Sequence, residues 1–303
     1  NIWDSADNKN NRYANEKESD KLKYFGGKNR SGKLIASKLN NIIKEKEIEN
    51  YVELFVGSGG VFKHVKCENK IINDKEPLII EFHKHIATGG KIELEYEDYY
   101  KDLEPLYDEF RKGNYGVTPL GVVGYVAYQC AFGGKKFETF ARDKLEKGRK
   151  TDYFKGGLSS LLKKQNYKNT KIFNLDFRDV QIPPNSLIYC DPPYKSTTGY
   201  SVEFDNVFFE NYINELSKDN IVIISEYSKL ENTDIYYSFE FTRGMRSGKN
   251  KENVTVKELL LSHKNNQLEK VKVLEQVSLF WVYKGERLWE SFIFQMKDIL
   301  LII

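Results

Sequence analysis

Cysteines, histidines and long apolar runs are scarce in this 303-residue sequence. The cysteines, Cys67, Cys130 and Cys190, stand far apart. Their spacing excludes a disulfide framework and a cysteine-rich zinc site and favours a reducing compartment. The four histidines form no ligand pattern, and the pair at 83 and 85 is interpreted as incidental, so no metal is expected. The longest apolar run, residues 299–303, is far below the roughly 20 residues that a membrane span needs. The polar start lacks a signal-peptide core, and we expect a soluble, intracellular protein without a membrane partner.

Net charge is also low, at +3, but the charges are unevenly distributed. Residues 81–109 hold three lysines and nine acidic residues, a net of 3 − 9 = −6. Residues 111–171 hold fourteen basic and four acidic residues, a net of 14 − 4 = +10. A basic middle segment in a nearly neutral chain favours a surface for a polyanion, with a solvated lysine-rich face as an equal alternative.

What the sequence does contain is a repeated alternation of apolar strands and amphipathic helices, which predicts a doubly wound, mostly parallel α/β sheet. Helices are expected at 34–43 and 77–85, with a short one starting at Val61. Strands are expected at 51–56, 70–74, 171–175, 186–190 and 220–225, and more weakly at 235–241 and 254–261.

The rhythm of strands and helices divides the chain into four parts. Residues 1–21 are polar and predicted to be a flexible lead-in. Segments 22–85 and 171–265 together form the α/β domain, and 86–170 is a mainly helical insertion that contains the basic run. Residues 266–303 do not fit the scheme and remain an unassigned extension.

Two glycine-rich loops suggest nucleotide binding. The first, Gly27-x4-Gly32-Lys33, lacks the Ser or Thr that would hold magnesium, because Leu34 follows, so nucleotide hydrolysis is disfavoured. The second, Gly57-Ser58-Gly59, follows a strand, and Asp74 stands 74 − 57 = 17 positions later. This arrangement suits an adenosine-containing cofactor.

In the second loop the third glycine of a dinucleotide fingerprint is replaced by Phe62. Its absence favours a cofactor without pyrophosphate, such as S-adenosylmethionine. A nicotinamide oxidoreductase remains an alternative that depends on the same loop and on Asp74 alone.

The sequence Asp191-Pro192-Pro193-Tyr194 follows the apolar strand 187–190. Two prolines stiffen the turn at the carboxyl end of a strand, where α/β proteins bind ligands. The Asp191 carboxylate and the Pro192 carbonyl could accept the two hydrogens of an exocyclic amino group, which would make its nitrogen more nucleophilic. Tyr194 could stack on a base that has left the duplex. The motif therefore predicts amino methylation of a nucleobase, and the alternative is a plain strand-ending turn.

In the order of its motifs the chain resembles the Dam-type, α-group (D12 class) DNA adenine N6-methyltransferases over about residues 22–265. The motifs are Lys23–Lys28, Phe55–Gly59, the acidic tip at Asp74 and Asp191–Tyr194. Four further stretches resemble orphan adenine methylases of phages and prophages, which implies a bacterial or phage protein acting at the nucleoid: 132–135, 175–179, 191–200 and 224–227. The glycine motif departs from the usual triple glycine.

The resemblance implies a role for each matching residue. Asp74 would hold the ribose hydroxyls, Asp176 and Phe177 would read the cofactor adenine, and Asp191 would face both the methionine amino group and the target amine. The implied catalytic residues are Asp191, Pro192, Pro193 and Tyr194. The implied S-adenosylmethionine-binding residues are Tyr24, Gly26, Gly27, Lys28, Phe55, Gly57, Ser58, Gly59, Asp74, Asp176, Phe177 and Asp191.

The insertion would then be the target-recognition domain for double-stranded DNA, with Lys135, Lys136 and Arg142 touching it. Arg243 and Arg246 lie in an expected polar loop and could contact phosphates. The protein would act as a monomer, with a cognate restriction endonuclease as a possible partner. Cytosine N4 methylation and a catalytically inactive DNA-binding relative remain alternatives, although aspartate at position 191 favours adenine.

Overall fold

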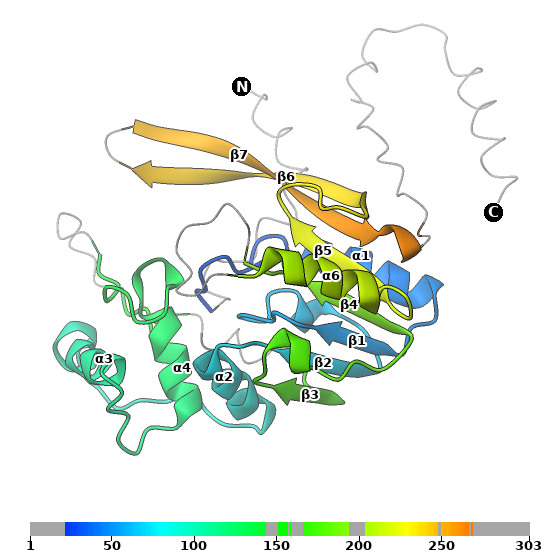
Figure 1. Ribbon diagram of the computed structural model, residues 1–303. Helices are drawn as coiled ribbons and strands as arrows, with labels where there is room; N and C mark the ends of the chain where they lie inside the picture. The colour runs from blue at the N-terminus through cyan, green and yellow to red at the C-terminus, as the bar shows by residue number, and fades with distance from the viewer. Residues whose placement is uncertain are drawn as a thin grey trace, which may run out of the picture. The chain divides into compact units, whose positions relative to one another are not determined.

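The computed structural model describes residues 22–143, 151–156, 158, 166–193, 204–247, 250–266 and 268 (Figure 1). The expected lead-in, Tyr194 and nearly all of the expected C-terminal extension lie outside these residues. None of the helices in the described part of the chain has the length and apolar character that a membrane span requires.

A seven-stranded sheet forms the centre of the fold, in the order β3-β2-β1-β4-β5-β7-β6. The first five strands in this order are parallel, and β7 is antiparallel to both β5 and β6. The predicted doubly wound, mostly parallel sheet is confirmed. The strands are β1 (Asn50–Glu53), β2 (Asn69–Asn73), β3 (Thr170–Phe173), β4 (Ser186–Cys190), β5 (Ile221–Glu226), β6 (Thr233–Ser247) and β7 (Asn250–His263).

Helices flank the sheet and build much of the insertion: α1 (Gly32–Glu45), α2 (Pro77–Ala87), α3 (Glu104–Arg111), α4 (Leu120–Gln129) and α6 (Asn206–Leu216). A π-helical turn, Tyr99–Leu103, leads into α3. The short helix expected from Val61 is a single 3-10 turn, Phe62–His64, because Val65 already has an extended backbone.

Successive side chains of a strand point to opposite faces of the sheet, so alternate residues pack against different helices. Val52 of β1 and Ile188 of β4 pack with Phe209 and Ile213 of α6. The neighbouring positions point to the opposite face, where Ile72 of β2 packs with the side chains of α2. Both faces of the parallel strands are therefore covered, which is what an all-parallel region needs to bury its apolar side chains.

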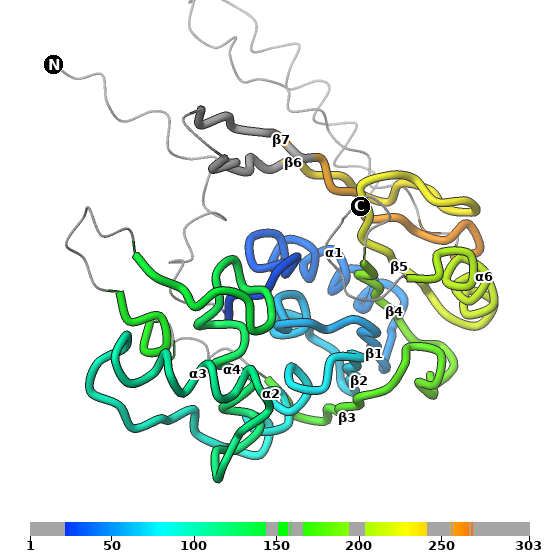
Figure 2. The backbone as a smooth tube through the Cα atoms, turned by 60° about the vertical axis from the view of Figure 1, so that its left-hand side comes forward, coloured from blue at the N-terminus to red at the C-terminus, as the bar shows by residue number. Residues whose placement is uncertain are grey.

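The insertion shares one core with the α/β domain. Helix α4 packs closely on α2, and a Cβ added at Gly124 would stand 2.2 Å from the Leu78 carbonyl oxygen. The lack of a Cβ at Gly124 therefore permits the close approach of α4 to α2. Figure 1 shows α4 beside α2, with α3 on the other side of α4, and α4 also lies beside α2 in the view of Figure 2. The boundary expected after residue 85 falls inside α2, which continues to Ala87.

Strands β6 and β7 form a long two-stranded ribbon. The sequence predicted a polar loop between residues 241 and 254, and this expectation is wrong. Both strands continue to the Ser247–Asn250 pair, so Arg243 and Arg246 lie within β6. Strand β5 pairs with β7 only as far as Glu226 and Leu259. The ribbon therefore extends past the carboxyl end of β5 (Figure 1).

Candidate active site

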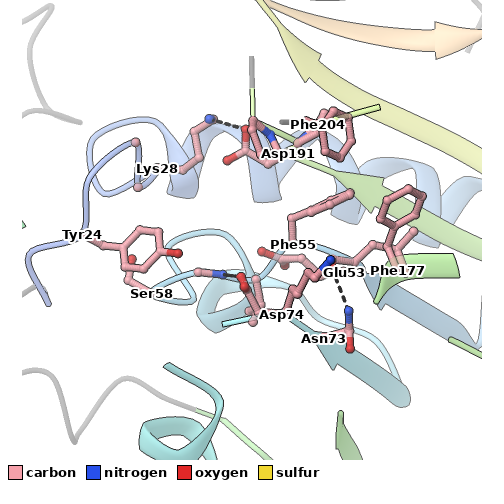
Figure 3. A pocket seen from close by; sticks show the side chains of 18 of the residues that line it. Tyr24, Lys28, Glu53, Phe55, Ser58, Asn73, Asp74, Phe177, Asp191 and Phe204 are labelled. Carbon is pink, nitrogen blue, oxygen red and sulfur yellow. Dashed lines mark hydrogen bonds and ion pairs between the residues drawn. The ribbon is translucent and has the colours of Figure 1, made fainter. Parts of the chain in front are cut away.

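A pocket opens at the carboxyl ends of β1, β2 and β4. Strand order reverses between β1 and β4, and such a switch point is where open α/β sheets bind ligands. The pocket is lined by Tyr24, Phe25, Gly26, Gly27, Lys28, Glu53, Leu54, Phe55, Val56, Gly57, Ser58, Gly60, Val61, Asn73, Asp74, Lys75, Asp176, Phe177, Arg178, Asp191, Pro192, Pro193, Phe204, Asp205 and Phe208 (Figure 3). The structure thus brings together the predicted cofactor and catalytic residues, apart from Gly59 and Tyr194. Gly59 lies behind this lining, where its amide donates to the Val56 carbonyl.

The first wall of the pocket is the loop Tyr24–Lys28, which is held in place by the insertion. The Phe25 amide donates to the Gly134 carbonyl at 2.9 Å, and the Lys23 amide donates to Oε1 of the buried Gln129 at the same distance. A Cβ on Gly134, whose φ is +69°, would stand 2.7 Å from the Tyr24 nitrogen. Glycine is therefore required there by both conformation and space.

At the end of this loop, Lys28 bridges two carboxylates. Its Nζ donates to Oδ1 of Asp191 at 2.5 Å and lies 3.4 Å from Oε1 of Glu258 (Figure 3 shows the Asp191 pair). The side chains of Lys28 and Glu258 are 7 % and 2 % exposed. Burial by itself would lower the pKa of Lys28, but the two carboxylates raise it above its ordinary value. Lys28 therefore keeps its positive charge in this buried site.

The turn Asp191-Pro192-Pro193 leaves the end of the fully buried strand β4 and enters the pocket lining. Asp191 is only 16 % exposed, and its position is set by the strand before it and by Lys28. Tyr194 lies outside the described residues, so its stacking role stays a prediction.

The glycine loop after β1 is fixed by three groups. Gly57 has a φ of +47°, and a Cβ there would stand 2.9 Å from the Tyr24 ring. Its amide donates to Oδ2 of Asp74 at 2.8 Å, and its carbonyl oxygen lies 2.8 Å from Nε2 of His83. Nδ1 of His83 lies 2.7 Å from the Tyr167 hydroxyl. His83, which was interpreted as incidental from the sequence alone, therefore positions the loop.

His83 is fully buried, and this burial lowers the pKa of its ring to about 4. The ring is therefore neutral at pH 7. Because the Gly57 carbonyl oxygen can only accept, Nε2 carries the proton. Nδ1 then accepts a hydrogen bond from the Tyr167 hydroxyl. Because Tyr167 belongs to the end of the insertion, this bond links the insertion to the cofactor loop.

The Asp74 carboxylate accepts the Gly57 amide on one oxygen and the Glu76 amide, at 3.0 Å, on the other. Burial raises the pKa of Asp74 to about 6, although these two amides oppose the shift. Each oxygen has a second lone pair. The expected bonds from Asp74 to ribose hydroxyls remain chemically available and stay a prediction.

Ser58 presents a buried hydroxyl with no hydrogen-bond partner among the described residues. It is 6 % exposed and lines the pocket beside Gly27, where an added Cβ would approach Ser58 Oγ to 3.2 Å. Buried hydroxyls are rarely left unsatisfied. A polar ligand group in this pocket would satisfy it.

An aromatic cluster forms the other end of the pocket. The Phe55 ring lies 5.3 Å from Phe177 and 5.9 Å from Phe204, measured between ring centroids. Phe208 adds a further ring beside Phe177. These faces suit a flat heteroaromatic group.

Asp176 stands at the edge of this cluster, where four donors surround its carboxylate. Arg178 donates from its amide, Nε and guanidinium terminus, and Lys75 donates from Nζ at 3.0 Å. The Arg178 bonds are the main reason that the pKa of Asp176 lies well below its usual range. A carboxylate has about four lone-pair sites. The predicted contact to a cofactor adenine would therefore replace or share one of these bonds.

The three basic residues of the insertion that were proposed for DNA contact are at least partly exposed and already have partners within the protein. Lys136 donates to Glu76 at 2.7 Å, and Arg142 bonds to Glu104. Lys135 lies over the Phe25 ring, 4.7 Å from its centroid. Polyanion binding would have to compete with the two carboxylate pairs.

Sequence reasoning missed several residues of the site. Glu53 lies two positions before Phe55 and Asn73 directly precedes Asp74, at the ends of β1 and β2, and that location was the available signal. Arg178 lies in the stretch 175–179 but was assigned no role, and Phe204, Asp205 and Phe208 carried no motif. Glu258 lies 67 positions after Asp191, on a strand whose pairing no local pattern revealed.

Part of the chain matches a known protein family. Residues 24–116 match the family model of the D12 class N6 adenine-specific DNA methyltransferases. Over this segment the chain is similar to that family. The resemblance stated from the motifs is confirmed, and the activity of the family is methyl transfer. The closer likeness to phage and prophage orphan enzymes stays a prediction.

Two solved structures resemble this chain at low identity. A proposed RNA methyltransferase from Pyrococcus horikoshii is 11 % identical, with 76 % of this chain and 83 % of that chain covered and a TM-score of 0.32. A proposed methyltransferase from Escherichia coli is 10 % identical, with 77 % and 86 % covered and a TM-score of 0.27. No curated protein matches the sequence.

Proposed function

We propose that this protein is a D12-class enzyme that transfers a methyl group from S-adenosylmethionine to the N6 amino group of adenine in duplex DNA. The observation that supports this most is the Asp191-Pro192-Pro193 turn at the sheet's switch point, with Lys28 bonded to Asp191 at 2.5 Å. The turn places an acceptor carboxylate in a pocket that also holds an aromatic cluster.

The donor set of the pocket fits S-adenosylmethionine, which supplies an electrophilic methyl group on a sulfonium. The unsatisfied Ser58 hydroxyl and the carboxylates of Asp74 and Asp191 match polar groups of such a cofactor. The rings of Phe55 and Phe177 suit its adenine. Tyr24, Gly26, Gly27, Lys28, Gly57 and Asp176 would complete the binding site, with Gly59 supporting the loop.

Methylation of the adenine amino group requires hydrogen-bond acceptors for its two hydrogens more than it requires a proton donor. In the proposed role, Asp191 and the Pro192 carbonyl accept the amino hydrogens, which directs the nitrogen lone pair to the methyl group. Pro193 holds the turn, and Tyr194 stacks on the extruded adenine. The lost amino proton leaves through the acceptors to solvent.

The DNA would lie across the insertion 86–170, acting as the target-recognition domain beside the α/β domain of 22–85 and 171–265. Lys135, Lys136, Arg142, Arg243 and Arg246 are the proposed phosphate contacts. We further propose a monomer in the cytoplasm of a bacterium or phage-infected cell, where a cognate restriction endonuclease is a possible partner.

The test of this proposal uses Asp191→Asn, which keeps the shape of the side chain and removes its charge. The transfer of labelled methyl groups from S-adenosylmethionine to DNA should slow by about 10²–10⁴-fold, the scale for a positioned polar catalytic group. The matched control is Asp234→Asn, on the surface beside Lys229. A rate for Asp191→Asn within tenfold of the unaltered protein would contradict the proposed role.

A further inference from the structure

The aromatic end of the pocket is built from segments that follow different strands. Phe55 comes after β1, whereas Asp176 and Phe177 come after β3. The Phe55 and Phe177 rings nevertheless lie 5.3 Å apart between their centroids. The ladder between β2 and β3 ends at the pair of Asn73 and Phe173. Asp176 and Phe177 therefore lie beyond the backbone ladder, and other bonds must hold them beside Phe55.

The side chain of Asn73 joins these two segments past the end of the ladder. Its Nδ2 donates to the Leu54 carbonyl oxygen at 3.2 Å and to the Leu175 carbonyl oxygen at 3.1 Å, and its Oδ1 accepts the Leu175 amide at 3.0 Å. Leu54 directly precedes Phe55. Leu175 directly precedes Asp176. The two-point bond to Leu175 therefore takes the place of the backbone partner that a further residue of β2 would provide.

These bonds commit the Asn73 amide to the backbone. An asparagine side chain has two N–H donors and an oxygen with two lone pairs. Both donors and one lone pair are used here, and the residue is 1 % exposed. Its own carbonyl oxygen accepts the Val56 amide at 2.9 Å, which ties the glycine loop to the same residue. Asn73 would therefore act on a ligand through Phe55, Asp176 and Phe177.

A fixed carboxylate beside two aromatic faces distinguishes one purine from another. Adenine carries an amino group at C6, which donates to a carboxylate, whereas hypoxanthine carries an oxygen there, which a carboxylate repels. A carboxylate that can shift could instead accept the N1–H of hypoxanthine. Because a hydrogen bond needs good alignment and a distance within about 3.2 Å, the preference for adenine depends on how firmly Asp176 is held.

We propose that Asn73 is a positioning residue that fixes Asp176 and Phe177 against Phe55 and so makes the pocket select adenine in the cofactor. This inference rests on the proposed use of S-adenosylmethionine and names the group that sets the base selectivity of that site. Because Asn73 is the last residue of β2, the sheet itself sets the position of the adenine-reading segment.

The experiment measures equilibrium binding of two ligands to the full chain. They are S-adenosylhomocysteine and S-inosylhomocysteine, which carries hypoxanthine in place of adenine. The ratio of their dissociation constants is the adenine preference. Asn73→Ala removes the three side-chain bonds and should lower this preference by about tenfold, the scale of one hydrogen bond to a charged acceptor. A merely structural role for Asn73 would weaken the binding of both ligands by the same factor.

Asn266→Ala is the matched control. Asn266 makes the same two-point bond, because its Nδ2 donates to the Val222 carbonyl oxygen at 2.8 Å and its Oδ1 accepts the Val222 amide at 3.3 Å. Val222 lies near the amino end of β5, at the opposite edge of the sheet from the pocket. The control should lower the free energy of unfolding, as Asn73→Ala does, and leave the adenine preference unchanged within about threefold.

Asn73→Ser keeps a hydroxyl that can replace part of these bonds, and it gives the same test where Asn73→Ala folds poorly. A preference that falls by more than about threefold with the Asn73 variant, and by less with Asn266→Ala, supports the inference. A smaller fall with the Asn73 variant, an equal fall with Asn266→Ala, or equal binding of the two ligands by the unaltered protein would overturn it.

The proposed function has a separate outcome in the same experiment. Where the unaltered protein binds S-adenosylhomocysteine but the adenine preference does not depend on Asn73, only the inference fails. Where the unaltered protein binds neither ligand, the proposed use of S-adenosylmethionine fails and the inference fails with it.

Discussion

Glu53 is a buried acid that holds a proton in the folded protein. The loss of this proton should make the stability of the protein fall as pH rises. Glu53 is 2 % exposed, and Tyr51 donates to its Oε2 at 2.5 Å. Burial raises the pKa of Glu53 from 4.5 to about 8, although Tyr51 opposes the shift. The folded protein thus holds a proton that the unfolded chain releases between these two pH values.

The sign and size of this pH dependence follow from the difference between the folded and unfolded pKa of Glu53. Where the folded state binds more protons than the unfolded state, the free energy of unfolding decreases with rising pH. The stability contribution of a group with pKa 4.5 unfolded and about 8 folded is fully present below pH 4.5 and lost by about pH 8. Between pH 5 and pH 9 the loss is about 4 kcal/mol.

Glu53→Gln mimics the protonated side chain and removes the titration. Its stability relative to the unaltered protein should therefore rise by about 4 kcal/mol between pH 5 and pH 9, measured as the difference in urea-unfolding free energies. Subtracting the two proteins cancels the contributions of Asp74 and His83, which both share. The control Glu231→Gln, at an exposed site, should show a constant difference.

A difference between Glu53→Gln and the unaltered protein that stays flat from pH 5 to pH 9 would refute this reasoning. It would mean that the Glu53 carboxylate is ionised in the folded state at pH 7 and adds a negative charge to the pocket.

Three other changes test the pocket and its surroundings. Gly134→Ala should destabilise the protein by about 2–4 kcal/mol, whereas Gly133→Ala, with the same positive φ but open space around it, should cost only about 1 kcal/mol, in thermal or urea unfolding. His83→Phe should cost about 2–5 kcal/mol because it leaves the Gly57 carbonyl and the Tyr167 hydroxyl without their partner, and should also weaken cofactor binding; a variant that unfolds and binds like the unaltered protein would remove His83 from this role. Replacing Lys135, Lys136 and Arg142 with glutamine should flatten the salt dependence of DNA affinity, with an unchanged slope placing the DNA elsewhere.

Strand positions were predictable from the sequence because the five parallel strands are short apolar runs bounded by turns. The predicted and observed limits of β4 agree, and β1 and β2 differ by one to three residues. The residues at the carboxyl ends of these strands then follow, because parallel strands bring them to one edge of the sheet. That is why Asp74 and Asp191 were found.

The ribbon and the groups that support the site were not predictable in the same way. The outer parts of β6 and β7 pair with each other, and residues 242–253 show no apolar alternation, so the sequence suggested a loop there. Glu258 and His83 act through contacts with residues 230 and 26 positions away. Local sequence patterns do not encode such contacts, and only the packed structure reveals them.

The most direct test of the central claim identifies the methylated nucleoside. Duplex DNA is incubated with the purified chain and methyl-labelled S-adenosylmethionine, digested to nucleosides and separated by mass. We predict label in N6-methyladenine, lost with Asp191→Asn and retained with Asp234→Asn. Label in N4-methylcytosine alone, or no label on any duplex together with no binding of S-adenosylmethionine, would contradict it.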